Sequence, residues 1–548
     1  PQQPIYSSLS NVFAVDYGGE EHYDTLVPSR EEYADNFKGV IFVDQNMANT
    51  ADRHPARIKI WGNDSLQTYI DSPEYHEKIA ADVVEKGYLL IEPSDLFVDQ
   101  LCEITGDFYF ITHARNKKGF ILPFDPKILL LFTPDEINKR TSISKTGKGY
   151  RVAFKATLVR SDGSDWVHTI EKQYDDKDVI KRAIPDSLSQ WPNFSHASWS
   201  WYFFFFVGNL PIHFSPRGLF SSHEISGLLA SAPDNSSKMR IIQNLKDQTA
   251  GLGRRLGLIE TQVLHEMYLL QSVPEAMICD AATNPEISGY VESKDRTVLG
   301  ILLLPEVPKI ELSARDASVG IDFGTTNTSA YVKIQNNKSQ PIKFEDRVVS
   351  PVVGSETDTE LSSILRAFFP HSDVGIPFLT ILRDRDLPQK AADVLPAWNS
   401  HLYYVNDVVS SISDLIGDKD RNLRFNLKWS NLPTDRSLVR QYMAQVVMQC
   451  LAELLSRGIR PENIDWKFSY PEAYPPSQLE NFIGICSSAT QMALAPDASS
   501  LDFTPKIGRQ SESLSTALYF VAEKNAYMIQ NAVTIDIGGQ TSDISIWQ

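Results

Sequence analysis

The feature that most constrains the fold is a pair of similar stretches that lie far apart in the chain. The first reads GIDFGTTNTSA at 320–330, and the second reads VTIDIGGQTSDISI at 533–546. In both, an apolar run predicts a buried strand that ends near an aspartate, Asp322 or Asp536. Glycine then permits a tight turn and strand-like residues follow, so each stretch predicts a β-hairpin with a polar turn.

The first turn carries groups that suit a bound phosphate. Gly324 lets the backbone approach a ligand closely, and Thr325 and Thr326 offer backbone N–H groups and hydroxyls. An aspartate beside such donors, here Asp322, suits a hydrated Mg²⁺. Threonine-rich hairpins also occur without a ligand, so the first stretch alone leaves both interpretations open.

The second turn completes the pattern. Asp536 lies 214 residues after Asp322 (536 − 322), which is enough chain for one lobe, and Asp543 enters the strand after the turn. Two such hairpins that face each other across a cleft would hold phosphates from both sides, with the two aspartates on the metal. The second turn itself consists of Gly538, Gly539, Gln540 and Thr541.

This pair of motifs resembles the two phosphate motifs of the superfamily that contains actin, sugar kinases and DnaK-type heat-shock-chaperone ATPases. GIDFGTTNTSA is close to the chaperone and sugar-kinase versions, and DIGGQTSDISI keeps the chaperone and bacterial actin pattern. FSYPEAYPPSQLENF at 468–482 and SESLSTALYFVAEK at 511–524 are similar to two further segments of the chaperone branch. The resemblance covers residues 318–548 and implies an α/β actin-like ATPase fold, of ribonuclease H-like type, in that part only.

The resemblance also implies a role for each matching residue, with ATP and Mg²⁺ as cofactors. Asp322 and Asp536 would bind Mg²⁺ through water and orient the attacking water, and Asp543 would join these acidic groups. Glu512 would position that water or sense the γ-phosphate. Hydrolysis would then need positioning and electrostatics, without a covalent intermediate. The phosphate contacts would come from Gly324, Thr325, Thr326, Gly538, Gly539, Gln540 and Thr541.

The sequence departs from the family pattern at three points. Gln540 replaces a third glycine, as in the ATPase activators of dehydratases and reductases, but the cluster-binding cysteines of those proteins are missing here. No local motif marks a catalytic lysine. Lys343 and Lys390 lie in the right region, but a solvated surface lysine is the expected interpretation of each. The given sequence ends at Gln548, before the position where the family has the rest of the second lobe and the adenosine-binding motif. We therefore expect a longer polypeptide, a completing partner or a loss of nucleotide binding.

The four regions predicted are an N-terminal α+β region at 1–145, a strand-rich domain at 146–310, a linker at 311–317 and the ATPase part at 318–548. YRVAFKATLV and WVHTIEKQY, on either side of Ser161-Asp162-Gly163, predict a hairpin. SDLFVDQLCEITG at 94–106 predicts a short helix. The aromatic stretch WPNFSHASWSWYFFFF is either core or a partner-binding face.

Within the ATPase part, strands and helices are expected to alternate. The pattern predicts a helix over 435–457 that ends at Gly458, a strand over 466–470 and a helix that Pro475-Pro476 opens. A further helix is expected at 511–524, and an apolar face on it is expected to pack. That face consists of Leu514, Ala517, Leu518 and Val521.

Composition limits the partners. The 548 residues include 52 basic and 69 acidic ones, for a net charge of −17, so no nucleic-acid partner is predicted. The most apolar run, WYFFFFV, is shorter than the roughly 20 residues of a membrane span. The cysteines have no disulfide-framework or zinc-site spacing, so buried thiols in a reducing, cytoplasmic compartment are expected. They are Cys102, Cys279, Cys450 and Cys486.

The leading functional hypothesis is a nucleotide switch. Its lobes would close on Mg-ATP and relax after hydrolysis, and the region before residue 310 would transmit the change to a protein partner. Three alternatives stay open: a filament protein of the bacterial actin type, a small-molecule kinase, and a non-hydrolysing scaffold or interaction module. Because fold alone does not settle function, the choice depends on the site.

Overall fold

A computed structural model gives the structure of the chain, and it divides into two compact units. Unit 1 contains Pro1–Gln190, Tyr202–Glu306 and Val349–Thr357, and unit 2 contains Trp191–Trp201, Val307–Val348 and Asp358–Gln548. The residues that the structure describes are 12–16, 39–43, 88–91, 93–104, 109–110, 119–130, 132–159, 165–182, 187–207, 213–219, 254–260, 263–270, 273–274, 276–282, 296–344, 347–353, 375–384, 397, 400–402, 423–429, 433–495, 501–523, 532–537 and 542–547.

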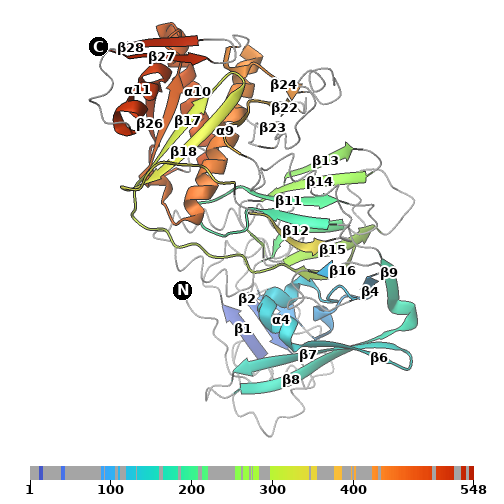
Figure 1. Cartoon of the computed structure of the whole chain (residues 1–548). Helices are drawn as coiled ribbons and strands as arrows, with labels where there is room; N and C mark the ends of the chain where they lie inside the picture. Colours follow the sequence, from blue (N-terminus) through green and yellow to red (C-terminus); the bar gives the residue numbers. More distant parts are fainter. Residues whose placement is uncertain are drawn as a thin grey trace. The chain divides into compact units, whose positions relative to one another are not determined.

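Unit 1 is rich in antiparallel strands (Figure 1). Its largest sheet has the order β13-β14-β11-β10-β20-β5, and β20 pairs with both β10 and β5. Smaller sheets have the orders β6-β7-β8, β12-β15-β16, β1-β2-β3 and β4-β9. The strands of the largest sheet are β5 (Tyr109–Phe110), β10 (Ser187–Trp191), β11 (Tyr202–Val207), β13 (Arg254–Glu260), β14 (Val263–Leu270) and β20 (Val349–Val353). The others are β1 (Val12–Asp16), β2 (Gly39–Val43), β3 (Tyr88–Ile91), β4 (Leu101–Ile104), β6 (Thr141–Thr146), β7 (Gly149–Val159), β8 (Asp165–Asp175), β9 (Val179–Arg182), β12 (His213–Leu219), β15 (Ala276–Ala282) and β16 (Arg296–Leu303).

The hairpin predicted around residues 161–163 is confirmed as β7 and β8, which pair antiparallel from Gly149↔Asp175 to Val159↔Asp165.

The aromatic stretch belongs to the core and not to an exposed face. In β11 the side chains from Tyr202 to Phe205 are at most 2% exposed, and β11 pairs antiparallel with β14. Within unit 2, Trp199 and Trp201 are each 1% exposed.

The helix predicted over 94–106 is wrong. The structure has a short 3-10 helix, η4 (Pro93–Leu96), and then strand β4, which pairs parallel with β9. Leu101 and Cys102 are fully buried in that strand, so long-range pairing decided the conformation where the local pattern allowed a helix. The α-helix found within the described residues of unit 1 is α4 (Pro134–Arg140), whose capping box joins Thr133 and Glu136.

Unit 2 is an α/β unit whose sheet has the order β19-β18-β17-β25-β26. β17 pairs antiparallel with β18 and parallel with β25, and β25 pairs parallel with β26. The strands are β17 (Ala317–Phe323), β18 (Asn327–Ile334), β19 (Gln340–Pro341), β25 (Ile464–Tyr470) and β26 (Lys506–Ser511), and β21 (Phe378–Leu379) also pairs with β18. A small sheet contains β22 (Leu382–Asp384), β23 (Ser400–Leu402) and β24 (Leu423–Arg424). The helices are α9 (Pro433–Ser456), α10 (Pro476–Leu494) and α11 (Glu512–Glu523), and the hairpin β27 (Ala532–Ile537) and β28 (Ser542–Trp547) follows.

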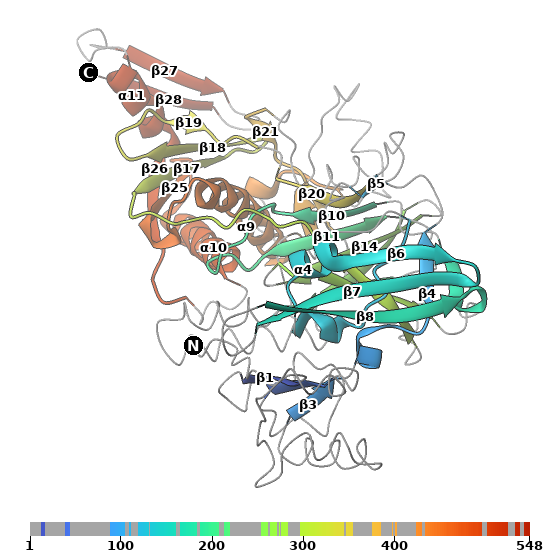
Figure 2. The ribbon, with the colours of Figure 1, turned by 90° about the horizontal axis from the view of Figure 1, so that it is seen from below.

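Helices α9 and α10 cover one face of this sheet, because alternate residues of β17 are apolar (Figure 1 and Figure 2). Phe323 at the end of β17 packs against Tyr442 of α9 at 5.4 Å and against Phe482 of α10 at 6.4 Å between ring centroids. The predicted helices and the strand at 466–470 are thus confirmed, and Gly458 with φ +76 follows the end of α9.

Two residues of the apolar face predicted on α11 are not packed as expected. Leu514 is 42% exposed and Leu518 is 51% exposed, whereas Ser513 is only 8% exposed. The side chains of Ala517 and Val521, also predicted for this face, lie outside the described residues. A small polar residue therefore faces the interior, and the two leucines lie at the surface of a helix that begins directly at the end of β26.

Hydrogen bonds hold two connecting segments of unit 2, Trp191–Trp201 and the chain that leads into β17, in place. Ser195 N–H donates to the Pro308 carbonyl at 2.9 Å, and Ser313 N–H donates to the Gly458 carbonyl at 2.7 Å. The Trp201 indole N–H donates to the Ala493 carbonyl at the end of α10 at 2.8 Å. Residues 311–317, predicted as a linker, thus contact the turn after α9.

His196, in the first of these segments, gives a pH dependence that can be measured. Its Nδ1 accepts a hydrogen bond from Ser198 N–H at 2.9 Å, and burial lowers the pKa of His196, partly offset by the charge of Glu462. Because the folded pKa lies below the unfolded one, His196 contributes stability above its unfolded pKa, and that stability is lost as the pH falls through the folded pKa. Urea unfolding across that range should show a smaller pH slope for His196→Gln than for the parent chain; equal slopes would contradict the assignment.

Candidate functional site

Two residues predicted for the site, Asp322 and Glu512, lie at one edge of the unit 2 sheet. β17, β25 and β26 run parallel, so their carboxyl ends lie together. Asp322 is near the end of β17, Ser469 is near the end of β25, and Glu512 directly follows β26. Ligands of open α/β sheets bind outside the carboxyl ends of such strands.

Hydrogen bonds to neighbouring residues fix the backbone of the first turn. Gly324 N–H donates to the Asn327 carbonyl at 2.9 Å, and the Gly324 carbonyl accepts from the Thr380 hydroxyl at 3.0 Å. Thr380 also shares a 2.8 Å bond with Thr328, to which the Tyr442 hydroxyl donates at 2.8 Å. A Cβ at Gly324 would lie 2.3 Å from the Asn327 carbonyl oxygen, so this position admits no side chain without a shift of the backbone.

Around this turn the polar groups differ in exposure. Thr325 is 8% exposed, whereas Thr326 and Asp322 lie at the surface. Asp322 Oδ1 accepts a hydrogen bond from the Ser469 hydroxyl at 2.5 Å. Asp322 is thus oriented by its neighbour on β25 and keeps a solvent-facing carboxylate.

The most informative group at this edge, Lys428, was not predicted from the sequence. Its Nζ lies 2.6 Å from Glu512 Oε1, and the two side chains are 5% and 13% exposed. Of the two lysines considered from the sequence, Lys343 is exposed and Lys390 lies outside the described residues. The signal for Lys428 was weak, since one lysine between two apolar residues in NLKWS has no periodicity or spacing to mark it.

The ion pair is connected to the first turn through the next residue. Lys428 and Trp429 lie in a short 3-10 helix, η9 (Leu427–Trp429), and the Trp429 indole N–H donates to Thr325 Oγ1 at 2.9 Å. The Tyr474 hydroxyl donates to the Lys428 carbonyl at 2.9 Å. Burial and then the charge of Glu512 raise the pKa of Tyr474, so this phenol remains a donor.

The structure describes the second hairpin only in part. β27 and β28 form the predicted hairpin, with Asp536 opposite Asp543, and the hairpin contacts α11. The turn residues Gly538, Gly539, Gln540 and Thr541 and the side chains of the two aspartates lie outside the described residues. Their roles therefore stay predictions.

The described residues contain no group of three or more His, Cys, Asp or Glu side chains that would hold a metal by themselves. The edge of the sheet nevertheless fits a hydrated Mg²⁺, because this ion keeps several waters and takes one or two carboxylates together with substrate phosphates. Asp322 is the described residue that would hold it, since its carboxylate faces solvent beside the first turn.

Comparisons with known proteins leave the family open. No family profile matches the sequence, and no curated protein matches it. Among solved structures, MreB5 of Spiroplasma citri bound to ADP matches with a TM-score of 0.24 and 14% identity, over 42% of this chain and 48% of that one. The chain thus aligns with about half the length of that protein, and a functional assignment has to come from the residues of the site.

A double-mutant cycle tests the buried ion pair. Lys428→Met removes the cation paired with the mostly buried Glu512 carboxylate, which should destabilise unit 2 by about 3–5 kcal/mol. Lys428→Met combined with Glu512→Gln removes both charges and should recover most of that loss. Urea unfolding measures both effects.

The matched control for this cycle is Lys467→Met, because Lys467 forms a more exposed pair with Asp465 at 3.7 Å. Its effect should stay within about 1 kcal/mol. A comparable loss in Lys428→Met and Lys467→Met would show that Lys428 and Glu512 are not paired in solution.

Proposed function

We propose that residues 318–548 bind ATP with Mg²⁺ and hydrolyse it, as a nucleotide switch of the DnaK-type and actin-like kind. The observation that carries the proposal is the buried Lys428–Glu512 pair, which is linked to the first phosphate turn through Trp429 and Thr325. A lysine and a carboxylate held beside a turn with backbone donors are among the groups that stabilise charge and position water in phosphoryl transfer.

The strand arrangement supports the finer fold assignment. Three antiparallel strands, β19, β18 and β17, are extended by the parallel strands β25 and β26, with helices between the parallel strands. This is the order that a ribonuclease H-like lobe requires. The hairpin β27–β28 after α11 stands where the second lobe would begin.

Each residue then has a chemical task. Lys428 would neutralise charge on the transferred phosphate, and Glu512, once released from Lys428, would position the attacking water. Thr325 and Thr326 would donate to phosphate oxygens, and Asp322 would bind Mg²⁺ through water. The second turn and Asp536 would contribute from the opposite lobe.

The coupling to a protein partner belongs to the same proposal. Unit 1 holds a separate core of strands, which gives the chain a second body that nucleotide-dependent closure can act on. All four cysteines are buried free thiols, which agrees with a reducing compartment. Among the described helices, none has the length and apolar character needed to cross a membrane.

A second candidate, a nucleotide-binding module that does not hydrolyse, is favoured by one observation. Glu512 is engaged by Lys428 in this structure and is only 13% exposed, so it is not free to activate water in this state. The two candidates agree on binding and differ on turnover, so one experiment separates them.

The test measures binding of a fluorescent ATP analogue and phosphate release by the full chain with Mg²⁺. Thr325→Val should weaken binding about tenfold, because a hydrogen bond to a charged phosphate is lost. Lys428→Gln should lower turnover about 10²–10³-fold, as expected when one group that stabilises transition-state charge is removed. Asp322→Asn keeps the side-chain shape and should reduce the Mg²⁺ dependence of binding.

The control is Lys467→Gln, which removes an exposed lysine of β25 away from the turn. It should leave binding and turnover unchanged. Binding that survives in every variant, or that is absent in the parent chain, would overturn the proposal. Binding without turnover in the parent chain would establish the non-hydrolysing candidate.

A further inference from the structure

A threonine outside the predicted motifs bonds two carbonyl groups of the first turn. Thr380 lies between β21 and β22 and is 2% exposed. Its backbone N–H donates to the Thr326 carbonyl at 2.7 Å, and its hydroxyl donates to the Gly324 carbonyl at 3.0 Å. The turn is thus held by a buried residue that lies 56 positions beyond Gly324 in the sequence.

The hydroxyl of Thr380 accepts one hydrogen bond and donates another. A threonine hydroxyl has a single proton, so the bond to Gly324 leaves Thr380 Oγ1 as the acceptor in its 2.8 Å bond with Thr328. Thr328 in turn accepts from the Tyr442 hydroxyl at 2.8 Å. Burial raises the pKa of Tyr442, so its phenol keeps the proton that it donates. The three hydroxyl groups therefore donate in one direction, from α9 toward the turn.

The bond to the Gly324 carbonyl also fixes the direction of the next amide group. The peptide that joins Gly324 to Thr325 is trans. In a planar trans peptide the C=O and N–H groups point in opposite directions. Because the carbonyl is turned toward Thr380, the Thr325 N–H points away from Thr380. No described residue accepts a hydrogen bond from this N–H, so it is available to a ligand.

Trp429 orients the second donor of Thr325. An indole N–H can only donate, so the 2.9 Å bond from Trp429 Nε1 uses Thr325 Oγ1 as the acceptor. The hydroxyl proton of Thr325 is then left for another acceptor. One residue thus presents an amide donor and a hydroxyl donor, and a phosphate group offers several acceptor oxygens to such a pair.

We propose that Thr380 is a positioning residue for phosphate binding at the first turn. Its hydroxyl holds the Gly324 carbonyl so that the Thr325 N–H faces a phosphate oxygen. This role rests on the proposed function and concerns the phosphate chain of the ligand, so an inorganic phosphate chain should depend on Thr380 as a nucleotide does. A donor that is already oriented needs no rearrangement when the ligand binds, and affinity should fall when the turn can relax.

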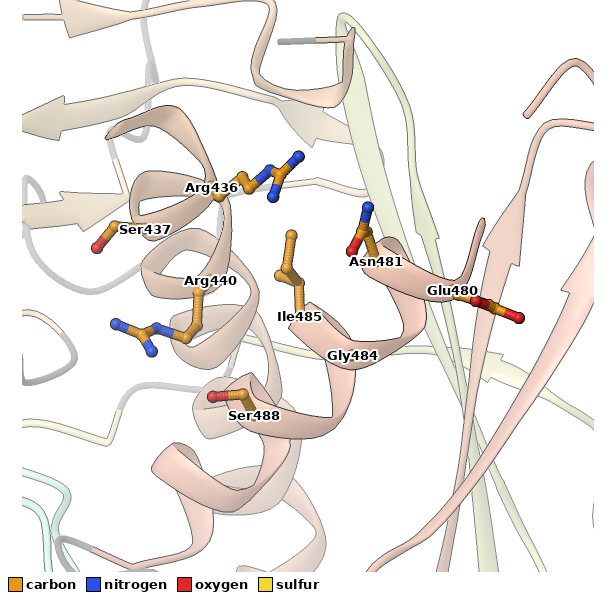
Figure 3. A pocket seen from close by; sticks show the side chains of 8 residues that line it. All are labelled: Arg436, Ser437, Arg440, Glu480, Asn481, Gly484, Ile485 and Ser488. Atoms are coloured by element: carbon orange, nitrogen blue, oxygen red, sulfur yellow. The ribbon is translucent and has the colours of Figure 1, made fainter. Parts of the chain in front are cut away.

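The cations in the pocket between α9 and α10 do not converge on one ligand. The pocket has a volume of about 430 Å³ and is lined in part by Arg436 and Arg440 of α9. Figure 3 shows that their guanidinium groups point in opposite directions, with Ile485 of α10 between them. Arg436 is exposed, and it therefore serves below as a control for general attraction between the chain and an anion.

The test measures the affinity of the full chain, with Mg²⁺, for a fluorescent ATP analogue and for inorganic tripolyphosphate. Thr380→Val keeps the shape of the side chain and removes its hydroxyl. It should weaken binding of both ligands about tenfold, because a hydrogen bond to a charged phosphate is no longer aligned. Thr380→Ser restores the hydroxyl and should bind both ligands nearly as well as the parent chain.

The matched control is Thr490→Val. Thr490 is another buried threonine of unit 2, and its hydroxyl donates to the Cys486 carbonyl within α10 at 2.8 Å. This variant loses a buried hydroxyl, as Thr380→Val does, and should leave both affinities unchanged. Arg436→Gln should leave them nearly unchanged at physiological salt, which screens distant charges.

Nuclear magnetic resonance checks the direction of the amide without any ligand. In a chain labelled with ¹⁵N in its threonines, the Thr325 amide signal is identified by its loss in Thr325→Val. Thr380→Val should shift this signal, because the peptide plane is no longer held, whereas Thr380→Ser and Thr490→Val should leave it in place. Tripolyphosphate with Mg²⁺ should shift the Thr325 signal of the parent chain, which tests the contact even if Thr380→Val does not fold.

Separate results would contradict the two proposals. Equal affinities of the parent chain and Thr380→Val for both ligands would contradict the role of Thr380 and leave the proposed function standing. A similar loss in Thr490→Val would assign the effect to stability and would also contradict that role, as would a Thr325 signal that Thr380→Val does not shift. A parent chain that binds neither ligand would overturn the proposed function and the role of Thr380 together.

Discussion

The site of unit 2 depends on the ion pair between Lys428 and Glu512. It joins a short 3-10 helix to the first turn of α11, across 84 residues of sequence. Trp429, next to the lysine, bonds Thr325 in the first turn, and Tyr474, on the segment that leads into α10, bonds the Lys428 carbonyl. Three separate loops are thus positioned around one pair of opposite charges. In a mostly buried place such a pair is stable only while both partners are present, so the loops are fixed together and not one by one.

Beneath these loops, a chain of hydroxyl groups fixes the backbone of the turn. Tyr442 of α9 bonds Thr328, Thr328 bonds Thr380, and Thr380 bonds the Gly324 carbonyl. Tyr442 and Thr328 are fully buried, so each hydroxyl needs these partners to offset its loss of water. The core of unit 2 is therefore connected to the turn by directional bonds as well as by the Phe323 ring. These bonds hold the backbone of the turn in one arrangement.

Local sequence patterns predicted the strand, turn and helix of this site better than the contacts between its residues. The turn at Gly324, the strand that ends at Tyr470 and the helix that begins after Pro475 follow from glycine, proline and apolar spacing. The role of Lys428 did not follow from such patterns, because it depends on a contact with Glu512 that only the folded sheet creates. The same holds for β4, where parallel pairing with β9 replaced the predicted helix, and for β20, which pairs with β5 across more than 200 residues of sequence. On α11, the apolar face was visible in the sequence, but its burial depends on neighbours that periodicity does not specify.

Under the proposed function, the turn at Gly324 and Lys428 would contact the same phosphate in different ways. Neutral hydrogen bonds fix the backbone and hydroxyl groups of the turn, whereas Lys428 is paired with Glu512, so a phosphate would have to compete with that carboxylate for the lysine. Binding at this turn would therefore depend on close geometry more than on long-range attraction, which salt screens.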